Sequence, residues 1–240
     1  MMLIVAIAAV FALLIALPGL ADVQQTSQEN HHGCHTRFHP GLHAYLTARV
    51  SEFGDIPAER KAKLEALASY IRTAQEGDGT ARLNFVCTHN SRRSHLSQLW
   101  AAAAAAYYEL QNIESFSGGS ESTAFNPQAV ATLPRNGWKI LKTTTTSNPI
   151  YLSSFAENRE AVVGFSKKFD TAPNPLENFA AIMVCSDADQ ACPHVPGVTQ
   201  RFAITYADPK AYDGTDHAAD AYDERSRQIA REMLYTMSKA

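Results

Sequence analysis

The chain lacks an excess of charge of either sign, and it contains no internal repeat. Its 240 residues carry a formal net charge of −3. This gives no basic surplus of the kind that nucleic-acid-binding proteins use, so we expect no nucleic-acid partner. Acidic residues are also too few to indicate a disordered chain. The length is sufficient for one sizeable domain with an extension.

Lys and Arg are absent from the beginning of the chain, where Met1–Leu17 is wholly apolar and the first basic residue is Arg37. This apolar run has the length of a signal-peptide core and is short for a membrane-spanning helix. Gly19 and Ala21 are small residues of the kind that signal peptidases require. We therefore expect residues 1–21 to be a signal peptide or a membrane anchor. The protein would then be exported to the periplasm or attached to a membrane, and it would be cytoplasmic if the start codon is wrongly assigned.

Cysteine is scarce, with four residues at positions 34, 87, 185 and 192. In an exported protein these thiols can pair as structural disulfides. The sequence around them instead favours a chemical role for at least one.

Histidines crowd a short polar stretch near the N-terminus. Imidazole and thiol groups are ligands for zinc and copper, and those in this stretch are His31, His32, Cys34, His35, His39 and His43. They follow no established ligand spacing, and Pro40 interrupts the helix that would align the last three histidines. We therefore predict a solvated linker over residues 22–43, no metal site, and no cofactor.

The remaining chain divides near residue 80. Residues 44–76 are expected to be helical, which makes residues 22–80 a histidine-rich linker followed by a helical extension. Residues 81–240 alternate apolar strands with helices. Strands are predicted at Leu83–Val86, Ile113–Phe116, Trp138–Leu141, Phe179–Val184 and Phe202–Tyr206, and helices at Ser94–Leu110, Pro127–Arg135 and Asp220–Ser238.

This alternation predicts an α/β domain with a central parallel sheet of about four strands and helices on both faces. Ligands of such sheets bind at the carboxyl ends of the strands. Cys87, Cys185 and Asp208 all follow predicted strands, so we expect them to converge at that edge.

The segment from Cys87 to Ser94 follows one strand and opens a helix. A loop in that position directs backbone N–H groups inward above a helix N-terminus, which forms a nest for a tetrahedral anion. Arg93 can present a planar guanidinium to two anion oxygens. The same positive surroundings favour the thiolate of Cys87. Ser94 is expected to donate a hydrogen bond to that sulfur, and Asn90 to brace the loop.

The pattern Cys-x-x-Asn-x-x-Arg-Ser resembles the low-molecular-weight protein tyrosine phosphatases and their relatives, the thioredoxin-coupled arsenate reductases. The resemblance extends over residues 81–238. It implies Cys87 as nucleophile, Arg93 as anion clamp, and Asp208 of the pair Asp208-Pro209 as general acid. The residues implied to bind the oxyanion are Thr88, His89, Asn90, Ser91, Arg92, Arg93 and Ser94.

Two loop positions depart from the family pattern. His89 stands where glycine is frequent, and it adds bulk to the loop. Arg92 stands where many phosphatases carry a second cysteine. Its guanidinium either adds positive charge to the anion site or points to solvent, and we favour solvent.

The stretch from Cys185 to Cys192 resembles the redox segment of the arsenate reductases. The resemblance implies a relay in which Cys87 attacks arsenate, Cys185 attacks Cys87, and Cys192 attacks Cys185. A thioredoxin-like protein or another thiol reductant would then reduce the outer disulfide. The small and acidic residues between Cys185 and Cys192 predict a flexible exposed loop. An inert pair or a structural disulfide is the alternative.

Two other functions stay open. The first is a phosphatase acting on phosphotyrosine or a small phosphate ester through a cysteinyl-phosphate, with Asp208 as general acid. The residues after Asp208-Pro209 are Lys210 and Ala211 rather than aromatic residues, which weakens the phosphotyrosine reading. The second is a protein that binds an oxyanion or a metal without catalysis.

Overall fold

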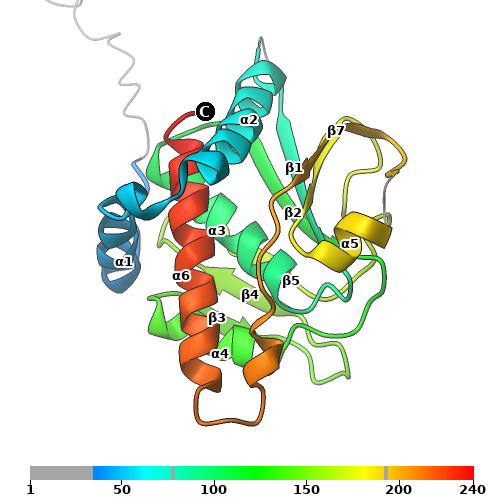
Figure 1. Ribbon diagram of the computed structural model, residues 1–240. Helices are drawn as coiled ribbons and strands as arrows, with labels where there is room; N and C mark the ends of the chain where they lie inside the picture. Colours follow the sequence, from blue (N-terminus) through cyan, green and yellow to red (C-terminus); the bar gives the residue numbers. More distant parts are fainter. Residues whose placement is uncertain (1–34, 77–78, 192–193) are drawn as a thin grey trace, which may run out of the picture. The chain divides into compact units, whose positions relative to one another are not determined.

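The computed structural model describes residues 35–76, 79–191 and 194–240, shown in Figure 1. The predictions for residues 1–21, and for Cys34 and Cys192, lie outside these residues. Within them, no helix combines the length and the apolar character needed to cross a membrane.

A four-stranded parallel sheet organises the chain, as the alternating pattern predicts. Its strand order is β2-β1-β6-β7. The strands are β1 (Ala81–Cys87), β2 (Ile113–Gly119), β6 (Phe179–Met183) and β7 (Val198–Ala203). Both β1 and β6 lie inside the sheet and are almost wholly buried, which explains why their sequences read as continuous apolar runs.

Helices pack around this sheet. They are α1 (Pro40–Val50), α2 (Ala58–Ala74), α3 (Arg93–Tyr107), α4 (Pro127–Arg135), α5 (Ser186–Ala191) and α6 (Ala218–Met237), with short 3-10 turns at Phe53–Asp55 and Pro209–Tyr212. Alanine fills much of α3, which favours the helix and keeps its surface small. This allows α3 to pack closely against β1, β2 and α6 (Figure 1). Trp100 of α3 is fully buried there, and its indole Nε1 donates to Ser226 Oγ of α6 at 2.9 Å.

Residues 44–76 are mostly helical, as predicted, but they do not form one continuous helix. Two helices occupy the region, because Gly54 and Pro57 interrupt the pattern and Pro57 has the extended backbone of an N-cap. The linker prediction for residues 22–43 is wrong at its C-terminal end. Pro40 begins α1 at the first helical position, where proline is favoured, and Phe38 forms a β-bridge with Ala156.

The predicted strand at Trp138–Leu141 exists as β3 (Lys139–Lys142), but it does not join the parallel sheet. It pairs antiparallel with β4 (Tyr151–Ser154), which pairs with β5 (Val162–Gly164). This three-stranded hairpin unit inserts between α4 and β6 along the chain.

The segment after Cys185 also differs from its prediction as a loop. Residues 186–191 form α5, and Asp189 accepts hydrogen bonds from Arg201 Nη2 of β7 at 2.5 Å and 2.6 Å through its side-chain and backbone oxygens. Acidic residues in a first turn are stabilised by the helix dipole, which accounts for a helix in a sequence rich in aspartate.

Candidate active site

Cys87 ends β1, and the loop after it leads into α3. The Cys87 side chain is 4% exposed, and its Sγ lies 3.1 Å from Ser94 Oγ. The Ser94 hydroxyl also accepts a hydrogen bond from Asn90 Nδ2 at 2.8 Å. Since Oγ already accepts this bond, its hydrogen is free to point at the sulfur. The three side chains therefore have the geometry that the sequence predicts for a supported thiolate.

Asn90 adopts a left-handed backbone conformation, with φ of 43°. Asparagine tolerates this region better than most residues with a side chain. Its Oδ1 accepts a hydrogen bond from the backbone N–H of Lys167 at 2.9 Å. The end of β2 approaches closely, since a Cβ added to Gly119 would lie 2.6 Å from the Asn90 nitrogen. Asn90 is thus fixed from two neighbouring segments.

The backbone carbonyls of the loop are bound on its outer side. Thr88 O accepts from the Glu121 N–H at 2.8 Å, and Ser91 O accepts from the Asn126 N–H at 2.9 Å. His89 O accepts from two side-chain hydroxyls. In the described part of the chain, the amides of residues 89–92 donate to no acceptor. Amides that have no acceptor, beside carbonyls that are already bound, are what an anion nest requires.

Arg93 meets Asp208 across the site. Its Nη2 donates to Asp208 Oδ2 at 2.6 Å, and its Nη1 donates to the carbonyl of Tyr206 at 3.0 Å. The Arg93 side chain is 10% exposed, and its Nε is buried with no partner among the residues described. Such a charge-assisted pair is short and strong. The predicted anion clamp and the predicted general acid are therefore in contact.

Cys185 follows β6, the strand beside β1. The Val184 N–H donates to Val86 O at 2.9 Å, which aligns the two strand ends. Cys185 is fully buried, and its Sγ accepts from the Ala188 N–H at 3.3 Å. Thr88 Oγ1 lies 3.6 Å from the same sulfur. The structure thus brings Cys185 and the Cys87 loop together, and both thiols are free; the redox role of Cys185 stays a prediction.

The prediction that the Arg92 side chain points to solvent is wrong. Its Nε donates to Tyr222 Oη at 2.6 Å and its Nη2 to Asp213 at 3.1 Å, and its side chain is 13% exposed. Tyr222 in turn donates to Asp213 at 2.8 Å. Burial raises the pKa of Tyr222 to about 12. The side chain of Arg92 therefore joins the loop to α6, and its backbone amide is the part that remains available to an anion.

His89 lies at the edge of the site. Its ring is 48% exposed and its Nε2 lies 3.5 Å from a carboxylate oxygen of Glu121. The His89 ring thus extends outward from the loop, and the predicted part of His89 in anion binding stays a prediction.

Two buried titratable groups beside the loop are not apparent from the sequence. His95 is 1% exposed and stacks on Phe125 at 4.1 Å. Burial and, secondly, the charge of Lys167 lower the pKa of His95 to about 3, so the ring is neutral. Lys167 is itself 5% exposed, and burial lowers its pKa to about 8. Neither residue belongs to a motif, so no local signal identifies them.

The histidine-rich stretch gives no metal centre in the part that the structure describes. His39 is buried, and its Nε2 lies 2.9 Å from Ser154 Oγ. His35 contacts the carboxylate of Glu109. The described histidines of this stretch therefore have structural partners.

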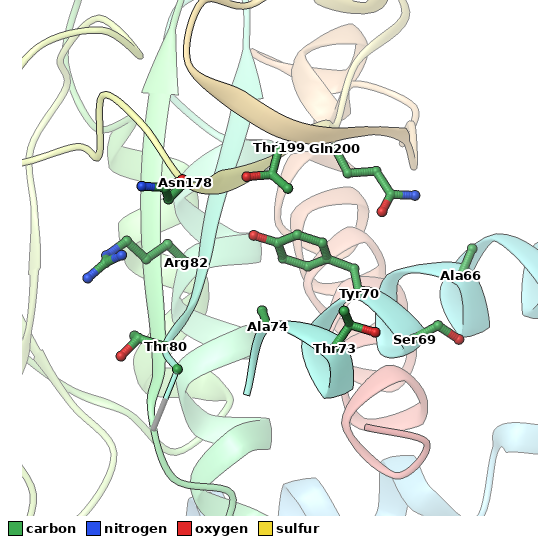
Figure 2. Close-up of a pocket in the computed structure, with 11 residues that line it drawn as sticks. Ala66, Ser69, Tyr70, Thr73, Ala74, Thr80, Arg82, Asn178, Thr199 and Gln200 are labelled. Atoms are coloured by element: carbon green, nitrogen blue, oxygen red, sulfur yellow. The ribbon is translucent and has the colours of Figure 1, made fainter. Parts of the chain in front are cut away.

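Hollows in the described part of the chain include one near the site and one far from it. One, of about 410 Å³, lies beside Asp208 and Pro209. The other, of about 830 Å³, lies between α2 and the amino ends of the strands, opposite to Cys87. Figure 2 shows the Tyr70 ring extending from α2 towards the strands that line this second hollow. No residue predicted for the site lines this second hollow.

Comparison with known proteins found a curated relative among the arsenate reductases. No family model matches the chain. The arsenate reductase of Bacillus subtilis (strain 168) is 27% identical over 143 residues, which cover 60% of this chain and 84% of that protein.

Solved structures were also compared. A low-molecular-weight protein tyrosine phosphatase from T. tengcongensis is 15% identical, with a TM-score of 0.46, covering 67% of this chain and 100% of that one. The thioredoxin-dependent arsenate reductase Cg_ArsC1′ of Corynebacterium glutamicum is 15% identical, with a TM-score of 0.38, covering 82% and 96%.

Proposed function

We propose that the chain is a member of the superfamily of low-molecular-weight protein tyrosine phosphatases and arsenate reductases, and that it reduces arsenate to arsenite with Cys87 as nucleophile. The similarity to the arsenate reductase of Bacillus subtilis supports this proposal. The position of Cys185 carries this proposal. It follows the strand beside that of Cys87, and its sulfur lies 3.6 Å from the hydroxyl of Thr88, the residue after Cys87. A phosphatase needs no second thiol at this point, whereas a thiol relay does.

The proposed reaction begins with arsenate in the nest formed by the amides after Cys87 and the guanidinium of Arg93. The Cys87 thiolate attacks arsenic and water leaves, which forms a sulfur–arsenic bond. The Cys185 thiolate then attacks the Cys87 sulfur. A disulfide forms, and the electron pair of the sulfur–arsenic bond leaves with arsenic, which is released as arsenite.

Cys192 then attacks Cys185, and an external thiol reductant restores the three thiols. A thioredoxin-like protein is the proposed reductant, and another thiol donor is required if the chain is exported through residues 1–21. Cys87 and Cys185 are both free thiols in this structure and Cys185 is fully buried, so the Cys185 segment must move for the two disulfides to form. Six residues form α5, and such a short helix is marginal on its own.

Phosphate ester hydrolysis is the second candidate. The contact between Asp208 Oδ2 and Arg93 Nη2 at 2.6 Å favours it, since a general acid must lie beside the bound anion. The surface next to Asp208 is formed by Pro209 and the half-exposed Tyr212. One exposed ring is a weak wall for a phosphotyrosine, so a small ester is the better substrate within this alternative.

Both candidates are tested on the full chain in parallel assays. One follows arsenate-dependent oxidation of thioredoxin with its reductase, and the other follows release of nitrophenol from an aryl phosphate. We expect Cys185→Ser to abolish multiple turnover with arsenate while leaving a single attack by Cys87. Cys34→Ser is the control variant, in which a different cysteine is replaced, and it should leave both activities unchanged.

The outcomes separate the candidates. Full multiple turnover of arsenate by Cys185→Ser would contradict the relay. Aryl phosphate hydrolysis that is lost in Cys87→Ser, and reduced about 100-fold or more in Asp208→Asn, would favour the phosphatase. Binding of phosphate or arsenate without any product under reducing conditions would favour an oxyanion-binding protein.

A further inference from the structure

Ser166, which follows β5, lies against the outer side of the Cys87 loop. It is 2% exposed. Its hydroxyl donates to the His89 carbonyl oxygen at 3.0 Å and accepts from the Thr123 N–H at 2.8 Å. Thr123 Oγ1 donates to the same His89 oxygen at 3.1 Å. The buried Ser166 hydroxyl thus donates one hydrogen bond and accepts another. These bonds connect the inserted hairpin, the loop and the chain after β2.

The backbone of Ser166 is itself fixed. The carboxamide of Asn148, between β3 and β4, accepts from the Ser166 N–H at 3.0 Å and donates to the Ser166 carbonyl at 2.8 Å. The next residue, Lys167, donates its N–H to Asn90 Oδ1. Two consecutive residues of this segment therefore hold two consecutive residues of the loop.

These hydrogen bonds set the orientation of the His89–Asn90 peptide unit, because a peptide unit is planar and trans. The carbonyl of His89 and the N–H of Asn90 belong to the same unit and point in opposite directions. A hydrogen bond that fixes the His89 oxygen outward therefore directs the Asn90 N–H towards the interior of the loop. Without the Ser166 hydroxyl, the His89 oxygen would keep only the Thr123 hydroxyl as a side-chain donor among the described residues, so this orientation of the unit would be less favoured.

We propose that Ser166 is a positioning residue for oxyanion binding, which acts through the His89 carbonyl and does not touch the sulfur or the anion. This inference rests on the proposed anion site, but it does not depend on whether arsenate or a phosphate ester is the substrate. The inserted hairpin, β3 to β5, thereby has a role in the active site although it contributes no reacting group.

The test measures how well inorganic phosphate protects Cys87 from iodoacetamide, with the Cys87 peptide quantified by mass spectrometry. We expect Ser166→Ala to weaken phosphate affinity about tenfold, the effect of about 1.4 kcal/mol that a lost buried hydrogen bond produces. Ser166→Thr keeps the hydroxyl and should bind phosphate more tightly than Ser166→Ala. Ser153→Ala is the matched control, because Ser153 is a fully buried serine of the same hairpin whose Oγ has no partner among the described residues.

Phosphate protection in Ser166→Ala equal to that of the wild type would overturn the inference. If Ser166→Ala does not fold, Asn148→Ala replaces it, since this variant frees the Ser166 backbone but keeps the hydroxyl, and it too should bind phosphate more weakly. Unchanged affinity in a folded Asn148→Ala would then count against the proposal. A wild-type protein that phosphate does not protect at all would refute the anion site itself, which is a separate failure.

Discussion

Replacing Lys167 by methionine should stabilise the protein at neutral pH. The Lys167 side chain is 5% exposed, and among the described residues no carboxylate forms an ion pair with it. Its ammonium lies 4.8 Å from the ring centre of Phe165, and burial lowers its pKa from 10.5 to about 8. A tenfold change in an ionisation constant corresponds to about 1.4 kcal/mol, so the buried charge costs up to about 3 kcal/mol. The variant also loses the cation–π contact, which stabilises the wild type by about 1 kcal/mol. The net gain in the free energy of unfolding for Lys167→Met is therefore about 2 kcal/mol.

The sign of this effect depends on pH in a defined way. Below pH 8 the amine is protonated in both the folded and the unfolded chain, so the full cost of burying the charge is present. Between pH 8 and 10.5 the unfolded chain binds the proton more strongly, and this lysine makes stability rise with pH. Above pH 10.5 the amine is neutral in both states and the cost is gone.

Urea unfolding at pH 7 and pH 10.5, in phosphate-free buffer, measures this difference. Lys167→Met should exceed the wild type by about 2 kcal/mol at pH 7 and lose that advantage at pH 10.5. Lys168→Met is the control, because Lys168 is the exposed neighbour. A destabilised Lys167→Met protein at pH 7, or a gain that is the same at both pH values, would refute the reasoning.

Two further substitutions test the loop. Gly119→Ala should abolish activity and weaken phosphate binding, because its Cβ would lie 2.6 Å from the Asn90 nitrogen and 2.7 Å from the Thr88 oxygen; normal kinetics in this variant would contradict the close packing. Arg92→Ala should lower the free energy of unfolding by about 1–3 kcal/mol, since it leaves Tyr222 and Asp213 without their shared cation. Its phosphate affinity should change little, and a loss of binding without a loss of stability would instead assign the Arg92 side chain to the anion site.

The parts of the site that the sequence predicts are those set by local chain physics. The apolar run of β1, the loop from Cys87 and the start of α3 are contiguous, so the strand, the anion nest and the helix N-terminus can all be predicted from residues 81–94. The alternation of apolar strands and helices likewise predicts the parallel sheet.

The errors arise where distant residues decide the outcome. Arg92 was expected at the surface, and its partner Asp213 lies 121 positions away along the chain. The Ser166 contact with His89 spans 77 positions and has no motif. The strand at Trp138–Leu141 was expected in the parallel sheet, yet it pairs within its own hairpin because β4 and β5 follow it closely.

The contact between Arg93 and Asp208 limits how an oxyanion can bind. Both Nη atoms of Arg93 already donate, one to Asp208 and the other to the Tyr206 carbonyl, whereas its buried Nε has no partner among the described residues. An anion that bound Arg93 without displacing either contact would therefore have to accept from Nε. In that position it would lie beside the Asp208 carboxyl group, which must then be protonated or move away to avoid facing a second negative charge. A protonated Asp208 is what a phosphatase needs for its leaving group, and a displaced Asp208 is sufficient for arsenate reduction. Asp208→Asn should therefore reduce phosphate ester hydrolysis but not arsenate reduction, and measuring both activities in this variant distinguishes the two reactions.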